Sequence, residues 1–354
     1  MKHRLIPLVL TAALVLSACS GASEPTTTDV PSPTSSSASP TSTPTTNTTT
    51  APTTSTTVAP ATTTTTTTVA PAAVSTLPFS VPVGADGITY DLDGSPPSGP
   101  TSFAALDDGS VVIADTMAVE RGEPRLLHYD RTGDLLAVID LADEEVAAIV
   151  DVATDGSQLA ILDVLVSMNR YRVLTLSVDG EVETVMDVPV GSRFENGLTG
   201  LTWDDSGILL DFEFGARYAR LIESDVVESR AVPVFGGTSI QLKPGSSWTT
   251  DVTTSRSSFS VERGTELGGA ILVGIAPDGS IVLVVDEVDL SGEAIAVTRR
   301  VQRYTATGEF LAETVFDAAD QFLDIPRPFE LDATGEILYL RAEPDRVKID
   351  PIGP

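Results

Sequence analysis

The sequence predicts an all-β fold: a β-propeller of four-stranded blades that follows a disordered linker rich in Thr, Ser and Pro. Three observations predict it. Short apolar runs alternate with Asp-Gly and similar turns, this pattern recurs about every 50 residues, and helical periodicity is nearly absent. Only residues 143–150 carry a pattern that fits a turn or two of helix.

The chain begins with a short positive segment, Lys2, His3 and Arg4, followed by an almost wholly apolar run over residues 5–16. That run is shorter than the about 20 residues that a membrane-spanning helix needs. A positive start followed by a short apolar run is typical of a secretory signal peptide. We therefore assign residues 1–18 to a signal peptide.

The signal peptide ends in Leu16-Ser17-Ala18-Cys19, which resembles the lipobox of bacterial lipoproteins. The resemblance implies cleavage before Cys19 and lipidation of its thiol, which would anchor the protein to the cell membrane, facing outside the cytoplasm. The alternative is plain secretion, with cleavage after Ala18 or Ala22. Cys19 is the only cysteine, so an intrachain disulfide framework and a Cys-rich zinc site are excluded.

Residues 19–76 combine Cys19 with a Thr/Ser/Pro-rich tether whose only charged residues are Glu24 and Asp29. Such a segment has almost nothing to bury and cannot offset the entropy of ordering. As a coil it would span about 40 Å. Tracts of this composition are typical O-glycosylation substrates, and a bare spacer is the alternative.

The net charge is −29, and the charges up to residue 76 cancel, so the whole imbalance falls on residues 77–354. This excludes nucleic acid as a partner, because phosphate contacts need a basic face. It also disfavours adhesion to anionic lipid, which leaves the membrane contact to the lipid anchor. A well-solvated surface explains the charge most simply; a bound cation or a basic protein partner is the alternative.

Residues 100–136 show the repeat most clearly: two apolar runs separated by Asp108-Gly109, then two more separated by Gly133. Such turns between apolar runs indicate hairpins, since they need positive φ. The equivalent first-turn glycines are Gly109, Gly156, Gly207, Gly279 and Gly335. Four short strands in about 50 residues make one propeller blade, so five units are recognised.

Two segments complete the ring. Residues 230–268 lack a clear Asp-Gly unit, so a blade there is degenerate or absent; six blades are expected, with five as the alternative. The last unit stops at Pro351, after its third strand, whereas residues 79–92 are strand-like. We expect that N-terminal segment to supply the missing outer strand, which would close the ring and remove exposed sheet edges.

The repeat resembles the NHL-type repeat of β-propellers. The shared features are Pro100, an apolar strand, Asp108-Gly109, a strand ending in Ala114-Asp115, and a strand that begins with Arg125. The loop at residues 116–123 is longer than that pattern. NHL-type propellers mostly act as interaction platforms, and that is the role the resemblance implies.

Few residues suit catalysis. His128 is the only histidine beyond the signal peptide, so a Ser-His-Asp triad and His-based metal sites lack parts, and a structural role is expected for it. Paired carboxylates could hydrolyse glycosides, but 50 acidic residues single out no pair. Trp203 and Trp248 could stack on sugars, although packing is the simpler expectation.

Asp115, Asp163, Asp211 and Asp286 occupy equivalent strand ends, so a propeller would place them around one end of the ring. Their simplest role is capping of turns and strands. The functional alternative is a ring of carboxylates near a channel that binds a cation such as Ca²⁺ through oxygen ligands. No other cofactor is indicated.

We therefore expect a monomeric, lipid-anchored, extracytoplasmic propeller that acts as a binding platform for an envelope protein or a small ligand. The main alternative is a propeller hydrolase that acts on a carbohydrate or lactone through carboxylates, with or without Ca²⁺. An assembly or sensor accessory of the envelope is a third option. Fold alone does not choose among them.

Overall fold

The computed structural model describes residues 78–84, 87–93, 97–115, 124–165, 170–188, 198–212, 215, 217–224, 226–291, 295–317 and 322–353. The predictions for residues 1–18, Cys19 and the tether to residue 76 lie outside these residues. All the described residues belong to one compact unit, Ala72–Pro354. Within them, no helix has the length and hydropathy needed to cross a membrane.

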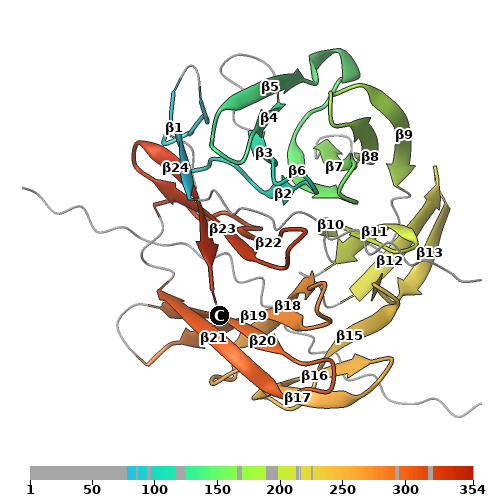
Figure 1. Cartoon of the computed structure of the whole chain (residues 1–354), viewed down its shortest axis with the longest axis vertical. Helices are drawn as coiled ribbons and strands as arrows, with labels where there is room; N and C mark the ends of the chain where they lie inside the picture. The colour runs from blue at the N-terminus through green and yellow to red at the C-terminus, as the bar shows by residue number, and fades with distance from the viewer. Residues whose placement is uncertain are drawn as a thin grey trace, which may run out of the picture. The chain divides into compact units, whose positions relative to one another are not determined.

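Six antiparallel sheets of four strands form a ring, which confirms the β-propeller and the six-blade prediction (Figure 1). Blades 1 to 3, innermost strand first, are β2 (Phe103–Ala105), β3 (Val111–Asp115), β4 (Arg125–Tyr129) and β5 (Leu135–Asp140); β6 (Ile149–Thr154), β7 (Gln158–Leu165), β8 (Arg170–Ser177) and β9 (Val182–Val188); and β10 (Leu198–Asp204), β11 (Gly207–Phe212), β12 (Arg217–Glu223) and β13 (Val226–Ala231).

Blades 4 to 6 are β14 (Val234–Phe235), β15 (Thr238–Pro244), β16 (Thr249–Thr254) and β17 (Ser258–Glu262); β18 (Gly268–Ile275), β19 (Ile281–Asp289), β20 (Ala296–Tyr304) and β21 (Phe310–Asp317); and β22 (Phe329–Leu331), β23 (Ile337–Glu343), β24 (Arg346–Ile352) and β1 (Phe79–Pro82). The segment without an Asp-Gly unit thus forms blade 4, whose inner strand has only two residues. The described helical structure is one short 3₁₀ turn, Ala142–Glu144.

In blades 1, 2 and 5, an Asp-Gly-Ser turn builds the first hairpin. Gly109 has a φ of 83°, in the left-handed region that favours glycine. The side chain of Asp108 accepts a hydrogen bond from the Ser110 N–H at 2.9 Å. The same arrangement recurs at the turn where the Ser280 N–H donates to Asp278 at 2.8 Å. The repeat in the sequence is therefore a repeat of turn chemistry.

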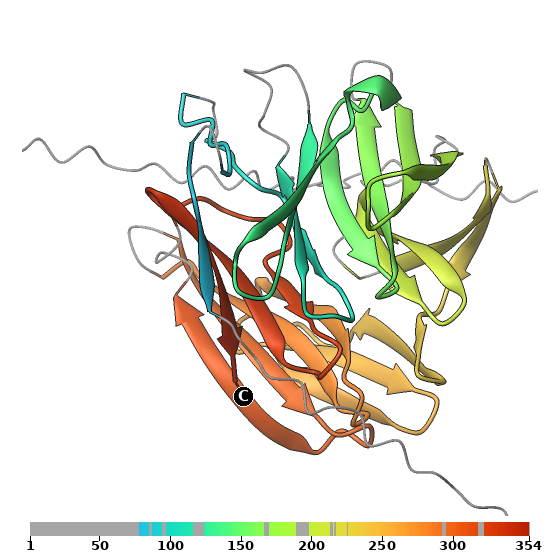
Figure 2. The same ribbon diagram turned by 45° about the horizontal axis from the view of Figure 1, so that its top comes forward.

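The N-terminal strand closes the ring, as predicted. Strand β1 pairs antiparallel with β24, with Phe79 opposite Ile349 and Val81 opposite Val347. Figures 1 and 2 show the two strands, from opposite ends of the described chain, side by side. Phe79 and Val81 are buried in a cluster that also contains Leu127 of blade 1 and Leu340 of blade 6.

The core lies mainly between blades rather than within them. One cluster joins blades 6 and 1, and others join blades 1 and 2, 2 and 3, 4 and 5, and 5 and 6. The remaining cluster contains only Leu209, Tyr218 and Ala231, all in blade 3. In the described part of the chain, the seam between blades 3 and 4 is therefore the one without a shared apolar cluster.

Deletion of residues 77–95 should abolish cooperative unfolding, because it exposes an edge of β24 and uncovers the blade 6–blade 1 core. Chemical denaturation followed by circular dichroism measures this as a lost or broadened transition. The matched control is deletion of residues 20–76, which removes the predicted tether and should leave the transition unchanged. A full-strength transition without residues 77–95 would contradict closure by β1.

Candidate functional site

Three of the four predicted aspartates lie in the C-terminal half of the second strand of a blade and pair with an arginine on the third strand. Asp115, Asp163 and Asp286 bond to Arg125, Arg172 and Arg299 at 3.0, 2.6 and 2.8 Å. Each arginine is the cross-strand neighbour of its aspartate. Each of these carboxylates is therefore held by an arginine of its own blade.

Asp115 is fully buried and also accepts a hydrogen bond from the Thr89 N–H at 3.1 Å. Burial raises the pKa of Asp115, while Thr89 and Arg125 oppose that rise. This aspartate therefore ties blade 1 to the segment that follows β1. Among the residues that the structure describes, no group of three or more His, Cys, Asp or Glu side chains could hold a metal ion.

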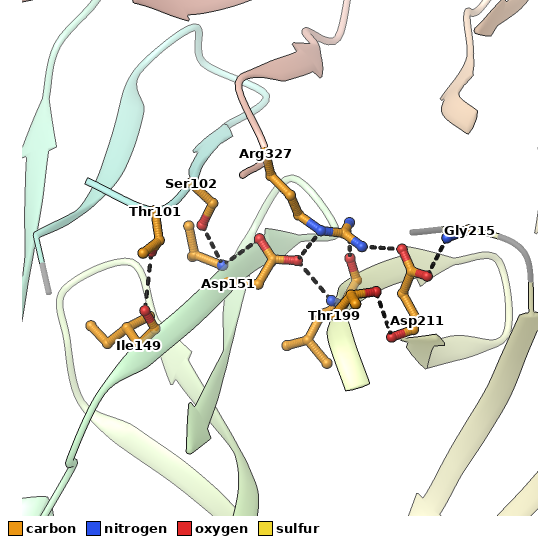
Figure 3. Close-up of polar contacts among 10 residues, drawn as sticks. Thr101, Ser102, Ile149, Asp151, Thr199, Asp211, Gly215 and Arg327 are labelled. Carbon is orange, nitrogen blue, oxygen red and sulfur yellow. Dashed lines mark hydrogen bonds and ion pairs between the residues drawn. The ribbon is translucent and has the colours of Figure 1, made fainter. Parts of the chain in front are cut away.

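The fourth aspartate, Asp211, differs because Tyr218 rather than an arginine stands opposite it on β12. Its cation is Arg327, from the segment that leads into β22 (Figure 3). Arg327 Nε also lies 3.1 Å from Oδ2 of Asp151 on β6, and Nη1 donates to the carbonyl of Leu201 at 3.2 Å. One guanidinium from blade 6 thus holds a carboxylate of blade 2 and another of blade 3.

Backbone hydrogen bonds fix both carboxylates in place. Asp151 Oδ2 accepts from the Leu201 N–H at 2.7 Å, and Asp211 Oδ1 accepts from the Gly215 N–H at 2.5 Å. The Arg327 N–H itself donates to the carbonyl of Thr101 in blade 1 at 3.2 Å. Arg327 consequently connects blades 6, 1, 2 and 3.

The electrostatics of this cluster follow from burial, since Asp151 and Asp211 are each only 1% exposed. Burial raises the pKa of both carboxyls, and the charge of Arg327 opposes that rise. Burial also works to lower the pKa of Arg327, but the two aspartates outweigh it and raise that pKa above its usual range. The guanidinium therefore stays charged.

A central cavity of about 640 Å³ opens beside this cluster. The inner strands of all six blades contribute to its lining, which marks it as the channel of the propeller. Ile271, Val273 and Phe329 supply apolar wall, and the lining also includes Trp203. A cavity of this size that combines apolar wall with charged side chains can hold a small molecule.

Glu330 on β22 lines the cavity next to Arg327. Burial raises the pKa of Glu330 well above its usual range, and the charge of Asp151 adds to this while Arg327 opposes it. Further carboxylates come from first turns of four blades: Asp107, Asp155, Asp205 and Asp332. The described lining cations, Arg299 and Arg327, are both in ion pairs, so the cavity is acidic.

Sequence reasoning missed Asp151, Arg327 and Glu330. A usable signal existed: inner strands are apolar, yet Val150-Asp151-Val152 and Phe329-Glu330-Leu331 each place one acid among apolar residues. Charges in such positions must find a partner or face a cavity. His128, by contrast, lies away from the cavity lining and contacts Ser110 Oγ through Nε2 at 2.9 Å. Trp248 is 54% exposed.

No family model and no curated protein matches this chain. Its fold is similar to that of a member of the DUF4221 family from Bacteroides vulgatus, with 9% identity, 78% of this chain and 96% of that one covered, and a TM-score of 0.49. A glucose dehydrogenase is also similar, with 15% identity, 72% of this chain and 96% of that one covered, and a TM-score of 0.39. So is a putative 6-phosphogluconolactonase from Bacteroides fragilis, with 14% identity, 78% of this chain and 96% of that one covered, and a TM-score of 0.40. Likeness at this level carries nothing about activity.

Replacing Arg327 with Met should destabilise the protein by about 3–5 kcal/mol at neutral pH, because it leaves two buried carboxylates without their cation. Urea denaturation measures the loss. Adding Asp151→Asn and Asp211→Asn to the same variant should restore most of it. Arg346→Met, at an exposed ion pair, is the control and should leave the stability close to that of the wild type. A cost below about 1 kcal/mol for Arg327→Met would contradict the bracing role.

Glu330→Gln should stabilise the protein at pH 8, and the gain should disappear toward pH 4. The unfolded chain releases the Glu330 proton near the usual pKa of about 4.3, whereas the folded protein holds it to higher pH. The wild type therefore loses stability as pH rises between those two pKa values. Thermal unfolding across pH tests this, with exposed Glu309→Gln as control. A pH-independent difference would refute it.

Proposed function

We propose that this chain is a lipid-anchored, extracytoplasmic binding protein whose central cavity takes a ligand with a cationic group. The observation that carries the proposal is the charge of that cavity. It is lined by carboxylates of several blades, and both described lining cations are engaged in ion pairs. The negative charge of this lining would attract a positive group that enters the cavity.

The proposed lipid anchor and the extracytoplasmic location are inferred from the sequence. The lipobox-like Leu16-Ser17-Ala18-Cys19 supports lipidation of Cys19, and the tether up to residue 76 would hold the propeller away from the membrane. Stable anchoring takes two or more acyl chains, which a diacylglyceryl group provides. The propeller would act there as a monomer, and its ligand is either a small amine or a basic side chain of an envelope protein.

Glu330 gives the cavity its recognition chemistry. Its carboxyl lines the cavity beside apolar wall such as Phe329. An ammonium or guanidinium beside Glu330 would stabilise the ionised carboxyl, so binding would release a proton. Because the free protein holds that proton above the usual pKa, affinity should rise with pH until Glu330 is ionised without ligand.

A hydrolase that acts on a carbohydrate or lactone, with or without Ca²⁺, is the second candidate. One observation favours it: Glu330 is a carboxyl with a raised pKa in a large cavity, which suits a general acid. Such chemistry also needs a second, ionised carboxylate within reach. The nearby candidates Asp151 and Asp211 are both bound to Arg327. We therefore favour binding over catalysis.

The test is calorimetric titration of the protein with arginine amide and, as the matched neutral ligand, citrulline amide. Arginine amide should bind more tightly as pH rises from 5 to 8 and should release protons, detected by comparing buffers of different ionisation enthalpy. Glu330→Gln should weaken binding about tenfold and remove the proton release, while Glu309→Gln changes neither. Equal binding of the two ligands would overturn the proposal, and hydrolysis of a lactone or glycoside that Glu330→Gln abolishes would favour the rival.

A further inference from the structure

The seam between blades 3 and 4 holds a second cavity, of about 260 Å³. It is lined by β12 and β13 on one side and by β15 on the other. This is the seam that lacks a shared apolar cluster in the described part of the chain. The cavity is therefore a consequence of how the two blades meet.

The short inner strand of blade 4 explains the gap. Strand β14 pairs only with Thr238 and Ser239, so the rest of β15 has no β14 residue beside it. In blade 3 the inner strand β10 has seven residues and runs along the full length of β11. The missing length in blade 4 leaves Leu242 and Lys243 to form one wall of the cavity.

The charge of this cavity is opposite to that of the rest of the protein. Arg217, Arg230 and Lys243 line it, and no carboxylate is found among the described lining residues. The chain has only 21 Lys and Arg against 50 Asp and Glu, so a described lining with basic residues and no acidic residue is unusual for this protein. No described carboxylate lies within ion-pair distance of Arg230 or Lys243.

The nearest candidates to neutralise these cations have other partners. Asp251 stands opposite Lys243 in the β15–β16 register, but its Oδ1 accepts a hydrogen bond from Ser260 Oγ at 2.7 Å. Glu228, on the same strand as Arg230, reaches toward Arg220 at 3.8 Å. The positive charge of Arg230 and Lys243 therefore remains available to a ligand.

The backbone at Arg230 is unusual in a way that favours function. Its φ is 69°, in the left-handed region where a non-glycine residue is strained. The β12–β13 register shifts here, from Tyr218 opposite Ala231 to Ala219 opposite Ser229, which makes Arg230 the bulged residue. Bulges re-aim side chains next to binding sites, and strain of this kind is retained where the side chain is needed.

We propose that this cleft binds a phosphate-type oxyanion, with Arg230 and Lys243 supplying the positive charge. Charge-assisted hydrogen bonds from arginine and lysine are the usual means of holding phosphate. At about 30 Å³ per water molecule, the cavity has room for an oxyanion with several waters. The site is separate from the central cavity, and the inference does not rest on the function proposed above.

Neutral donors complete the site. Gln241 lines the cleft and offers an amide. Tyr218 lines it too; burial and the charge of Asp211 raise the pKa of its hydroxyl, which therefore stays protonated across the physiological range. Arg217, whose guanidinium lies 5.1 Å from the Phe212 ring centroid, also lines the cleft.

The experiment is thermal unfolding of the full chain in inorganic phosphate and in chloride at matched ionic strength. Phosphate should raise the wild-type unfolding temperature above the chloride value. Arg230→Gly relieves the backbone strain, so this variant should unfold at the same temperature as the wild type or higher in chloride, yet lose the phosphate-dependent rise. Lys243→Gln should weaken phosphate binding about tenfold, and exposed Arg256→Gln should respond as the wild type does.

A soluble glycerol phosphodiester, tested alongside, distinguishes the source of the phosphate. Stronger stabilisation by the diester would support the site with a lipid headgroup or envelope polymer as ligand, whereas stronger stabilisation by inorganic phosphate would support it with a free ion. The proposal is overturned if neither probe acts beyond ionic strength. It is equally overturned if the double variant Arg230→Gly/Lys243→Gln responds like the wild type.

Discussion

Ring closure is the constraint on which the rest of this structure depends. Each blade is a small sheet that buries most of its apolar side chains against a neighbour, so an open ring would expose the apolar faces of the two blades that border the gap. Strand β1 prevents this by pairing with β24, which fuses the two ends of the described chain into blade 6. Closure also brings Arg327 of blade 6 within reach of Asp151 and Asp211, and so creates the polar cluster at the central cavity.

The second organising feature is the placement of the few positively charged side chains. With 50 acidic and 21 basic residues, the protein cannot pair most of its carboxylates. Several of its arginines pair with buried carboxylates, as at Asp115, Asp163 and Asp211. Exposed acids remain in water, where they cost little. The result is an acidic central cavity, against which the basic cleft between blades 3 and 4 stands out.

Much of the fold could be predicted because turn chemistry is local. Gly109 and its equivalents mark hairpins, and the missing fourth strand of the last unit indicated closure. The equivalent positions of Asp115, Asp163, Asp211 and Asp286 were also readable, and three of their arginines follow one strand later. The role of Arg327 could not be predicted, because its partners lie more than 100 residues away in the sequence. Only the closed ring brings them together. Blade 4 was the hardest to recognise because a two-residue inner strand leaves almost no pattern.

Native-state hydrogen exchange resolved along the sequence tests the closed ring most directly. If β1 is an integral strand of blade 6, those of its amides that donate hydrogen bonds to β24 should open only together with β24 and the adjoining core of blade 1, at the free energy of global unfolding. One shared opening free energy is therefore expected for these strands. Rapid exchange of these β1 amides while β23 and β24 stay protected would show that the ring does not depend on its N-terminal strand, and would contradict closure by β1.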